Sequence, residues 1–359
     1  MRCGSLSLLL ITCLFSLAYT YAITGASGAV DTSTGERPAR QEFRLFTVSG
    51  AAFDLYILAL QQLTQEEQNF QLSFFQVSGI HDRPYIPWDG VNGQYEAGYC
   101  THSSILFPSW HRPYLALFEQ LLWNNAQNIA ATYPSSLRAQ YQSAAQSLRI
   151  PFYDWALNST MPDQTNEPMI LINTPDGLRN IKNPLYDYTF HPQPNHSDFP
   201  ESDGQASLCL PQYVEYADGN SQPNISNMML EANADAIRSG VYNLISSQPD
   251  YAPFSNTGFV DDRGNRYDSI ENIHNGIHTL IGNGGHMAIV PYSAFDPIFW
   301  LHHTNVDRLI AIWQAIYPDS WINSSEVTAG GTFTDAPGSS EDANTGAFLY
   351  DSNHDLPLN

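Results

Sequence analysis

Six of the chain's eleven histidines fall into two triplets, and this pattern indicates metal chemistry. The triplets are His81, His102 and His111 in the first third of the chain, and His274, His278 and His303 in the last third. Imidazole is a neutral ligand for copper, zinc, iron and nickel, and three protein ligands leave a metal with open coordination positions. An all-histidine set with no carboxylate at ligand spacing fits copper better than zinc or non-haem iron. The sequence therefore predicts a pair of open copper sites within one domain.

Helices are expected to position most of these ligands. Apolar periodicity predicts helices over residues 47–63 and 69–81, and the second must end before Arg83-Pro84. His81 lies on the apolar face of that second helix, where a buried core histidine is the commoner interpretation of a single such residue. His111 is expected to open a long helix, because apolar residues follow it on the same face at offsets of four, seven and eleven.

His274 and His278 give the strongest local ligand signal. They lie four residues apart, so both rings project from one side of a helix. Asp268 or Ser269 is expected to cap the start of this helix, and Gly282 to end it.

The last predicted helix has Asp296 as its N-cap and Pro297 as its first residue, and it extends to about residue 316. It carries His302 and His303 in succession. Adjacent helical residues point about 100° apart, so only one of the two rings should reach the site. Spacing does not choose between them, because each shares a helix face with apolar residues.

Other segments are expected to cover this core. Residues 158–267 are rich in Pro, Asn, Asp, Ser and Gly, which predicts long surface loops with one short helix over residues 228–245. Beyond Trp321 the composition predicts a loose tail with a short strand over residues 331–334. The domain plan is a signal peptide at residues 1–22, a catalytic domain at 23–330 and a tail at 331–359.

The predicted signal peptide consists of an apolar run over residues 6–18 behind Arg2, followed by small residues, and it is too short to span a bilayer. Sequons fit a secreted protein and occur at Asn158, Asn195, Asn224 and Asn323. The balance of 14 basic and 36 acidic residues gives a net charge of −22, which excludes nucleic acid and anionic membrane as expected partners.

Removal of the signal peptide leaves two cysteines, Cys100 and Cys209. In a secreted protein one disulfide between them is a standard interpretation. An alternative arises from Cys100-Thr101-His102, because residues i and i+2 of an extended segment point to the same side. The sulfur and the imidazole would then lie close enough for a covalent thioether.

Five motifs make the sequence resemble the type 3 copper proteins, meaning tyrosinases, catechol oxidases and molluscan-type oxygen carriers, and it looks most like the secreted fungal members. They read FQVSGIH at 75–81, CTH at 100–102, LFPSWHRPY at 106–114, HNGIH at 274–278 and DPIFWLHHTNVDR at 296–308. The resemblance implies a mainly α fold, with a central four-helix bundle holding a dinuclear copper site, long surface loops and few short strands.

Carried over by position, the resemblance assigns the first triplet to one copper and His274, His278 and His303 to the other. It places His302 beside the ligands without making it one. Fungal members carry a thioether, so the resemblance implies a bond between Cys100 and His102 and leaves Cys209 unpaired.

The implied reaction is oxidation of o-diphenols to o-quinones, with dioxygen as co-substrate reduced to water. Hydroxylating a monophenol also requires a base, because the phenol pKa is about 10. The resemblance places Glu271 and Asn275 where family members orient a water for this step, although a helix-start acid favoured by the helix dipole also explains Glu271. Phe299 resembles a bulky residue that crowds the second copper, and Val290 resembles a residue at the substrate entrance.

These residues predict strong diphenolase and weak monophenolase activity on small phenols, with aminophenols also fitting. The alternatives are a full tyrosinase with efficient monophenolase activity, a reversible oxygen carrier, and an inert secreted core. The chain stops about 45 residues after the copper helix, so we expect no separate shielding domain. The assembly state does not follow from the sequence.

Overall fold

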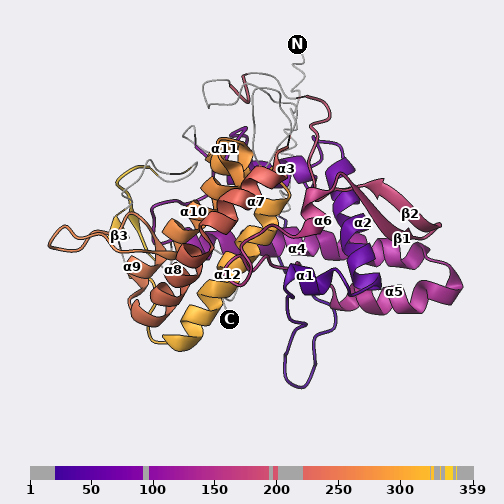
Figure 1. The fold of residues 1–359 in the computed structure, drawn as a ribbon, viewed down its shortest axis with the longest axis horizontal. Helices are drawn as coiled ribbons and strands as arrows, with labels where there is room; N and C mark the ends of the chain where they lie inside the picture. Colours follow the sequence, from indigo (N-terminus) through magenta and orange to yellow (C-terminus); the bar gives the residue numbers. More distant parts are fainter. Residues whose placement is uncertain are drawn as a thin grey trace, which may run out of the picture.

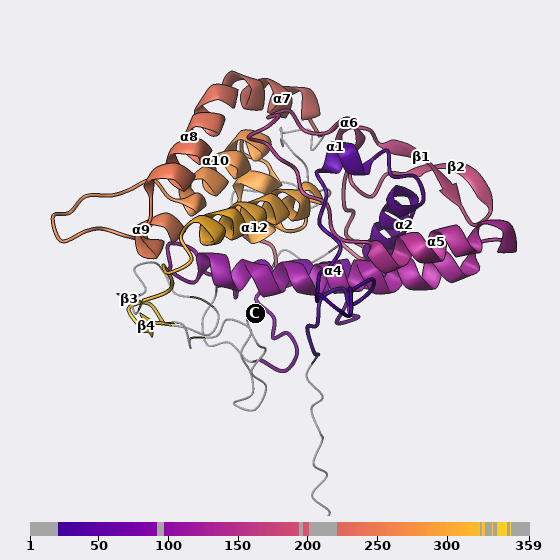
Figure 2. The same cartoon turned by 90° about the horizontal axis from the view of Figure 1, so that it is seen from below.

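The computed structural model describes residues 21–91, 97–193, 197–200, 221–323, 325–326, 332, 336–342 and 345. Long helices dominate this part of the chain, and the mainly α prediction is confirmed. α4 (Phe107–Thr132) runs the length of the molecule, with α12 (Ile298–Ile316) and α10 (Ile270–Gly282) over one half (Figure 2). α2 (Ala51–Gln65) and α5 (Ser135–Ser147) lie at the other end, beside the hairpin of β1 (Met169–Thr174) and β2 (Gly177–Lys182) (Figure 1).

Capping residues decide where the ligand-bearing helices begin. α3 (Phe74–His81) begins five residues later than predicted, because the Ser73 side chain accepts a hydrogen bond from the Gln76 amide. α2 also begins later than predicted, at Ala51, since Gly50 adopts a positive φ of 62° and separates α2 from the short helix before it. This short helix is α1 (Phe43–Phe46).

α4 starts one turn before His111, which corrects the prediction that this histidine opens the helix. The helix begins at Phe107 with Pro108 in its first turn. Pro113 therefore lies in the second turn, where it removes one intrahelical hydrogen bond. The helix nevertheless continues through all 26 residues, because its apolar face is buried.

The predicted cap of α10 is confirmed, whereas α12 begins one residue later than predicted, with Pro297 as its N-cap and Ile298 as its first residue. Ser269 accepts a hydrogen bond from the Asn272 amide at 3.1 Å, and α10 ends at Gly282 before Asn283, which is left-handed. Asp296 lies just before that N-cap and accepts a hydrogen bond from the Ile298 amide at 3.1 Å, and α12 ends at Ile316 as predicted.

The region predicted as long loops holds more regular structure than expected. Besides the β1–β2 hairpin it contains α6 (Asp163–Asn166), α7 (Pro223–Ala232), α8 (Ala234–Ser247) and α9 (Tyr251–Ser255). The single predicted helix over 228–245 is in fact two, which meet at Asn233. The hairpin turns at Pro175-Asp176, and Gly177 begins β2 with a φ of 103° that other residues adopt only with strain.

Short elements complete the chain. A 3-10 turn, η2 (His286–Ala288), and α11 (Val290–Ser293) connect α10 to α12. β3 (Ser325–Glu326) pairs with β4 (Ser340–Glu341). The strand predicted over 331–334 falls mostly outside the described residues, and Thr332 is not in a strand.

Aromatic packing joins α4 to α12 beneath the site. The rings of Phe118 and Trp300 stack in parallel, with centroids 3.7 Å apart, and both side chains are buried. Tyr114 on the preceding turn packs 4.9 Å from the same indole and donates a hydrogen bond to the Val77 carbonyl of α3. This contact brings three ligand helices to one place.

Candidate metal centre

The first histidine triplet converges from three separate segments. His81 is the last residue of α3, His102 lies on the loop before α4, and His111 lies in the second turn of α4. Their ring centroids are 5.4 to 5.8 Å apart. The His111 Nδ1–H donates to the Phe107 carbonyl at 2.7 Å, so its Nε2 must carry the lone pair. That Nε2 is buried and has no hydrogen-bond partner, as expected of a metal ligand.

The second triplet converges more tightly. His303 Nε2 lies 3.1 Å from the Nε2 of His274 and 3.1 Å from the Nε2 of His278. Metal–nitrogen bonds of about 2.0–2.1 Å hold ligand nitrogens roughly 3.3 Å apart in a tetrahedral site. The three nitrogens therefore already stand close to metal-ligand spacing.

Hydrogen bonds on the far side of the α10 rings aim these nitrogens. The His278 Nδ1–H donates to the Met287 carbonyl at 2.7 Å, and the His274 Nδ1–H donates to Asn275 Oδ1 at 2.9 Å. Each bond places the ring proton on Nδ1 and leaves Nε2 as the ligand atom.

The two triplets form one site rather than two. The rings of His111 and His303 stack with centroids 4.7 Å apart, and His102 lies 6.4 Å from His274. The described histidines thus fit two adjacent metal ions, each held by three imidazoles.

Burial keeps all six rings in the neutral form that binds metal. Desolvation lowers the pKa of His102 to about 4 and of His278 to about 3. The pKa of each of the other four lies well below its usual value, for the same cause and because of neighbouring histidines. Protons therefore do not compete with metal near neutral pH.

Cys100 lies directly beside the first triplet. Its Sγ is 3.3 Å from His102 Nδ1, and the residue is buried. Burial, and then the nearby Asp82, raises the pKa of the Cys100 thiol well above its usual value. This is the side-by-side placement that the i, i+2 argument predicted. Cys209 lies outside the described residues.

Glu271 contacts two loops beside the site. Its carboxylate accepts from the Ser103 amide at 2.7 Å, from the Thr257 amide at 2.8 Å and from the Thr257 hydroxyl at 3.1 Å. Burial raises its pKa, and these hydrogen bonds oppose the rise. Glu271 thus holds the His102 loop against α10, a role that the sequence did not reveal.

A cavity of about 240 Å³ opens onto the histidines. Its lining includes His81, His102, His274, His278, Glu271, Asn275 and Val290. Val290 lines this cavity and is 44% exposed. Phe299 is not among the lining residues; it is fully buried and stacks on the His303 ring at 4.0 Å.

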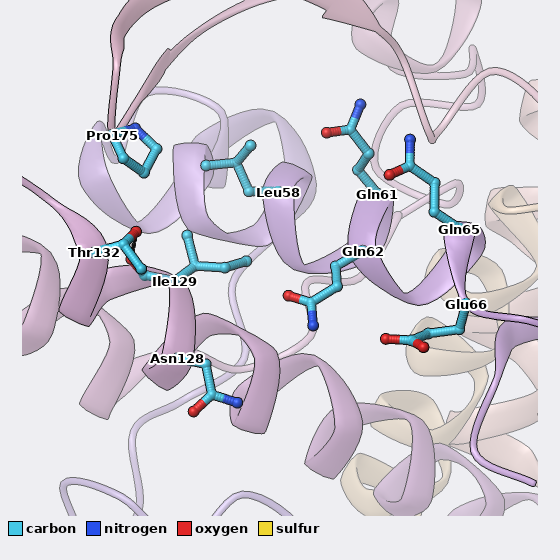
Figure 3. Close-up of a pocket in the computed structure, with 9 residues that line it drawn as sticks. All are labelled: Leu58, Gln61, Gln62, Gln65, Glu66, Asn128, Ile129, Thr132 and Pro175. Carbon is cyan, nitrogen blue, oxygen red and sulfur yellow. Dashed lines mark hydrogen bonds between the residues drawn. The ribbon is translucent and has the colours of Figure 1, made fainter. Parts of the chain in front are cut away.

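Elsewhere, a shallow groove of about 490 Å³ lies between α2 and α4 (Figure 3). Gln61, Gln62, Gln65 and Asn128 line it with amides, and it contains no histidine or cysteine. Among the described residues no helix has the length and apolar character needed to cross a membrane. The sequon residues Asn158, Asn224 and Asn323 are exposed, whereas Asn195 lies outside the described residues.

Comparison with known proteins agrees with this centre. The family model of the common central domain of tyrosinase matches residues 71–316. A tyrosinase of Podospora anserina is 38% identical over 328 residues, which cover 87% of this chain and 57% of the relative. Polyphenol oxidase 4 of Agaricus bisporus is 37% identical over 290 residues, which cover 77% of this chain and 46% of that relative. The chain thus spans about half the length of the curated relatives it matches.

Solved structures of tyrosinases also resemble this chain. A structure of latent and active mushroom tyrosinase aligns with a TM-score of 0.83 at 33% identity, covering 92% of this chain and 86% of that one. A holo-protyrosinase from Aspergillus oryzae aligns with a TM-score of 0.72 at 26% identity, covering 84% of this chain and 63% of that one. The chain therefore belongs to the tyrosinase family, whose type 3 copper proteins hold two copper ions and use dioxygen as co-substrate.

Proposed function

We propose that this protein is a secreted dicopper oxidase that converts o-diphenols to o-quinones and reduces dioxygen to water, with weak hydroxylation of monophenols. The observation that carries the proposal is the pair of three-histidine sets that meet at one cavity of about 240 Å³. That volume suits a small phenol. The predicted signal peptide and the exposed sequon residues support secretion.

The chain's own side chains prepare the site in three ways. Six imidazoles are held neutral by burial and supply the ligand atoms, with His81, His102 and His111 on one side and His274, His278 and His303 on the other. Two bound copper ions would supply the electron-transfer chemistry between diphenol and dioxygen. Phe299 packs against His303 and keeps water from that face of the ring. Cys100 is placed to bond His102 and restrict its loop.

Glu271 and Asn275 are proposed to act together on the phenolic proton of a monophenol. Both line the cavity, and burial raises the Glu271 pKa, which makes its carboxylate a stronger base. Much of its hydrogen-bonding capacity is already used by Ser103 and Thr257. Asn275 Oδ1 is likewise engaged by His274. These commitments support monophenolase activity weaker than diphenolase activity.

Oxygen consumption with 4-tert-butylcatechol and with tyrosol tests the proposal. We expect rapid consumption with the catechol and slow consumption with tyrosol. Equal rates would establish the alternative of a full tyrosinase, and reversible oxygen binding without turnover would establish an oxygen carrier. If copper-loaded protein neither binds oxygen nor oxidises either phenol, dicopper chemistry is refuted altogether.

Two variants test the role of Glu271. Glu271→Gln removes the base, so the tyrosol rate should fall at least tenfold more than the catechol rate. Thr257→Val removes one hydrogen bond to the same carboxylate and keeps the base, so it should leave the ratio of the two rates unchanged. Parallel loss of both rates in Glu271→Gln would leave Glu271 with its loop-holding role alone.

A further inference from the structure

Distance does not decide which of two adjacent histidines of α12 completes the second triplet. The His302 ring centroid lies 5.1 Å from that of His274 and 4.7 Å from that of His278. The corresponding distances for His303 are 4.7 and 5.3 Å. Ligand atoms of all four residues lie within 4.8 Å of one another. Both rings are therefore close enough to compete for the same metal.

A hydrogen bond from Trp155 separates the two rings chemically. The Trp155 Nε1–H donates to His302 Nδ1 at 3.1 Å, in a fully buried pair. An indole can only donate, so His302 Nδ1 must carry the lone pair and Nε2 must carry the proton. One nitrogen of His302 is then engaged by the indole, and the other has no lone pair to offer a metal.

Two bonds from the residues just before Trp155 hold this segment against α12. The Tyr153 amide donates to the Leu301 carbonyl at 3.1 Å, next to His302. Asp154 accepts from Arg308 at 3.1 Å, further along the same helix. Trp155 thus follows α12 closely, and its N–H stays aimed at the same ring nitrogen.

We propose that Trp155 selects His303 over His302 as the third ligand of the second copper by holding His302 in its Nε2–H tautomer. The inference rests on the ligand set of the proposed function. Trp155 is a positioning residue in this scheme, because it acts through His302. Without its N–H, the His302 ring can move its proton to Nδ1 and present a lone pair from Nε2.

Copper content tests the proposal through a gain of binding. His303→Ala should hold about one copper per chain, because the tautomer of His302 prevents it from replacing the lost ligand. Adding Trp155→Phe to His303→Ala should restore copper toward two per chain. Trp313→Phe is the matched control: Trp313 is equally buried on α12, but its indole N–H donates to the Gln248 carbonyl. The His303→Ala/Trp313→Phe protein should stay at about one copper.

The outcomes distinguish this proposal from the proposed function. Wild-type protein holding fewer than two coppers would refute the function. If wild type holds two coppers but a folded His303→Ala/Trp155→Phe protein does not regain the second copper, only the role of Trp155 is refuted. Two coppers in the His303→Ala single variant would refute that role as well. If the double variant does not fold, nitrogen NMR of histidine-labelled wild type decides: a protonated His302 Nδ1 overturns the proposal, and a protonated Nε2 supports it.

Discussion

Gly98 is the position where one methyl group should do most damage to the first histidine triplet. A Cβ at this residue would lie 1.9 Å from the His81 carbonyl oxygen and 2.4 Å from the Asp82 Cα. Real Cβ atoms do not come within 3.0 Å of such neighbours. In Gly98→Ala the two backbone segments must therefore separate by about 1 Å, the difference between the required and the available distance.

The cost follows from the contacts that this separation breaks. The Tyr99 amide donates to the Ile80 carbonyl at 3.2 Å, and the Cys100 amide donates to the His81 carbonyl at 3.3 Å. Both bonds would stretch beyond 4 Å, roughly, and leave buried groups unpaired at about 1–2 kcal/mol each. We expect the free energy of unfolding to fall by about 2–4 kcal/mol. His81 and Cys100 would also move by several times the roughly 0.2 Å that a metal site tolerates.

Gly276→Ala is the matched control, because Gly276 lies between two second-site histidines and a Cβ there meets nothing within 4 Å. It should raise the free energy of unfolding by about 0.5–1 kcal/mol and keep both coppers, since alanine favours helix more than glycine does. Denaturant melts and copper analysis on both variants make the comparison. A Gly98→Ala protein with wild-type stability and two coppers would refute the predicted clash with residues 81 and 82.

Three further predictions concern the whole fold. Burial raises the pKa of Asp296 to about 8, so the folded protein keeps a proton that the unfolded chain loses above about pH 4. The free energy of unfolding should therefore fall by about 1.4 kcal/mol per pH unit as pH rises from about 4 to 8. Asp296→Asn should remove this slope, and parallel plots of unfolding free energy against pH for the two proteins would contradict the reasoning. Asp307 accepts from both Arg40 and Arg112, so Asp307→Asn should lower the free energy of unfolding by about 2 kcal/mol, and an unchanged denaturation midpoint would count against that pairing. Chelating the copper should lower the melting temperature, since binding at a thousand times the dissociation constant adds about 4 kcal/mol to the folded state, and copper should restore it; identical melts with and without metal would argue against binding to the folded state.

Local signals predicted the helices that carry the ligands. The Ser269 cap and the Asp296 hydrogen bond depend on side chains two or three residues from the groups they bond, so the sequence near each helix start contains the necessary information. The same is true of the α10 pair, because residues four apart share a helix face in any helix. The start of α3 was misplaced because apolar periodicity extends past the Ser73 cap.

The β1–β2 hairpin was missed for a different reason. Its turn at Pro175-Asp176, followed by Gly177, consists of residue types that favour turns, but the surrounding polar composition favoured loops. Only two of the six residues of β1 are buried, Ile170 and Ile172, which contact the core, so the apolar pattern is short. Packing against the rest of the molecule stabilises a hairpin that local preference indicates weakly.

What the sequence by itself determined is the chemistry of the ligands: residue types and helical spacing predict two sets of three imidazoles suited to copper. Only the tertiary structure decided that the sets face each other, that Glu271 holds the Ser103 and Thr257 loops, and that Trp155 donates a hydrogen bond to His302. The physical reason is range. A cap or a helix face depends on residues a few positions apart, whereas the Trp155–His302 bond joins positions 147 residues apart, and no local pattern encodes that distance.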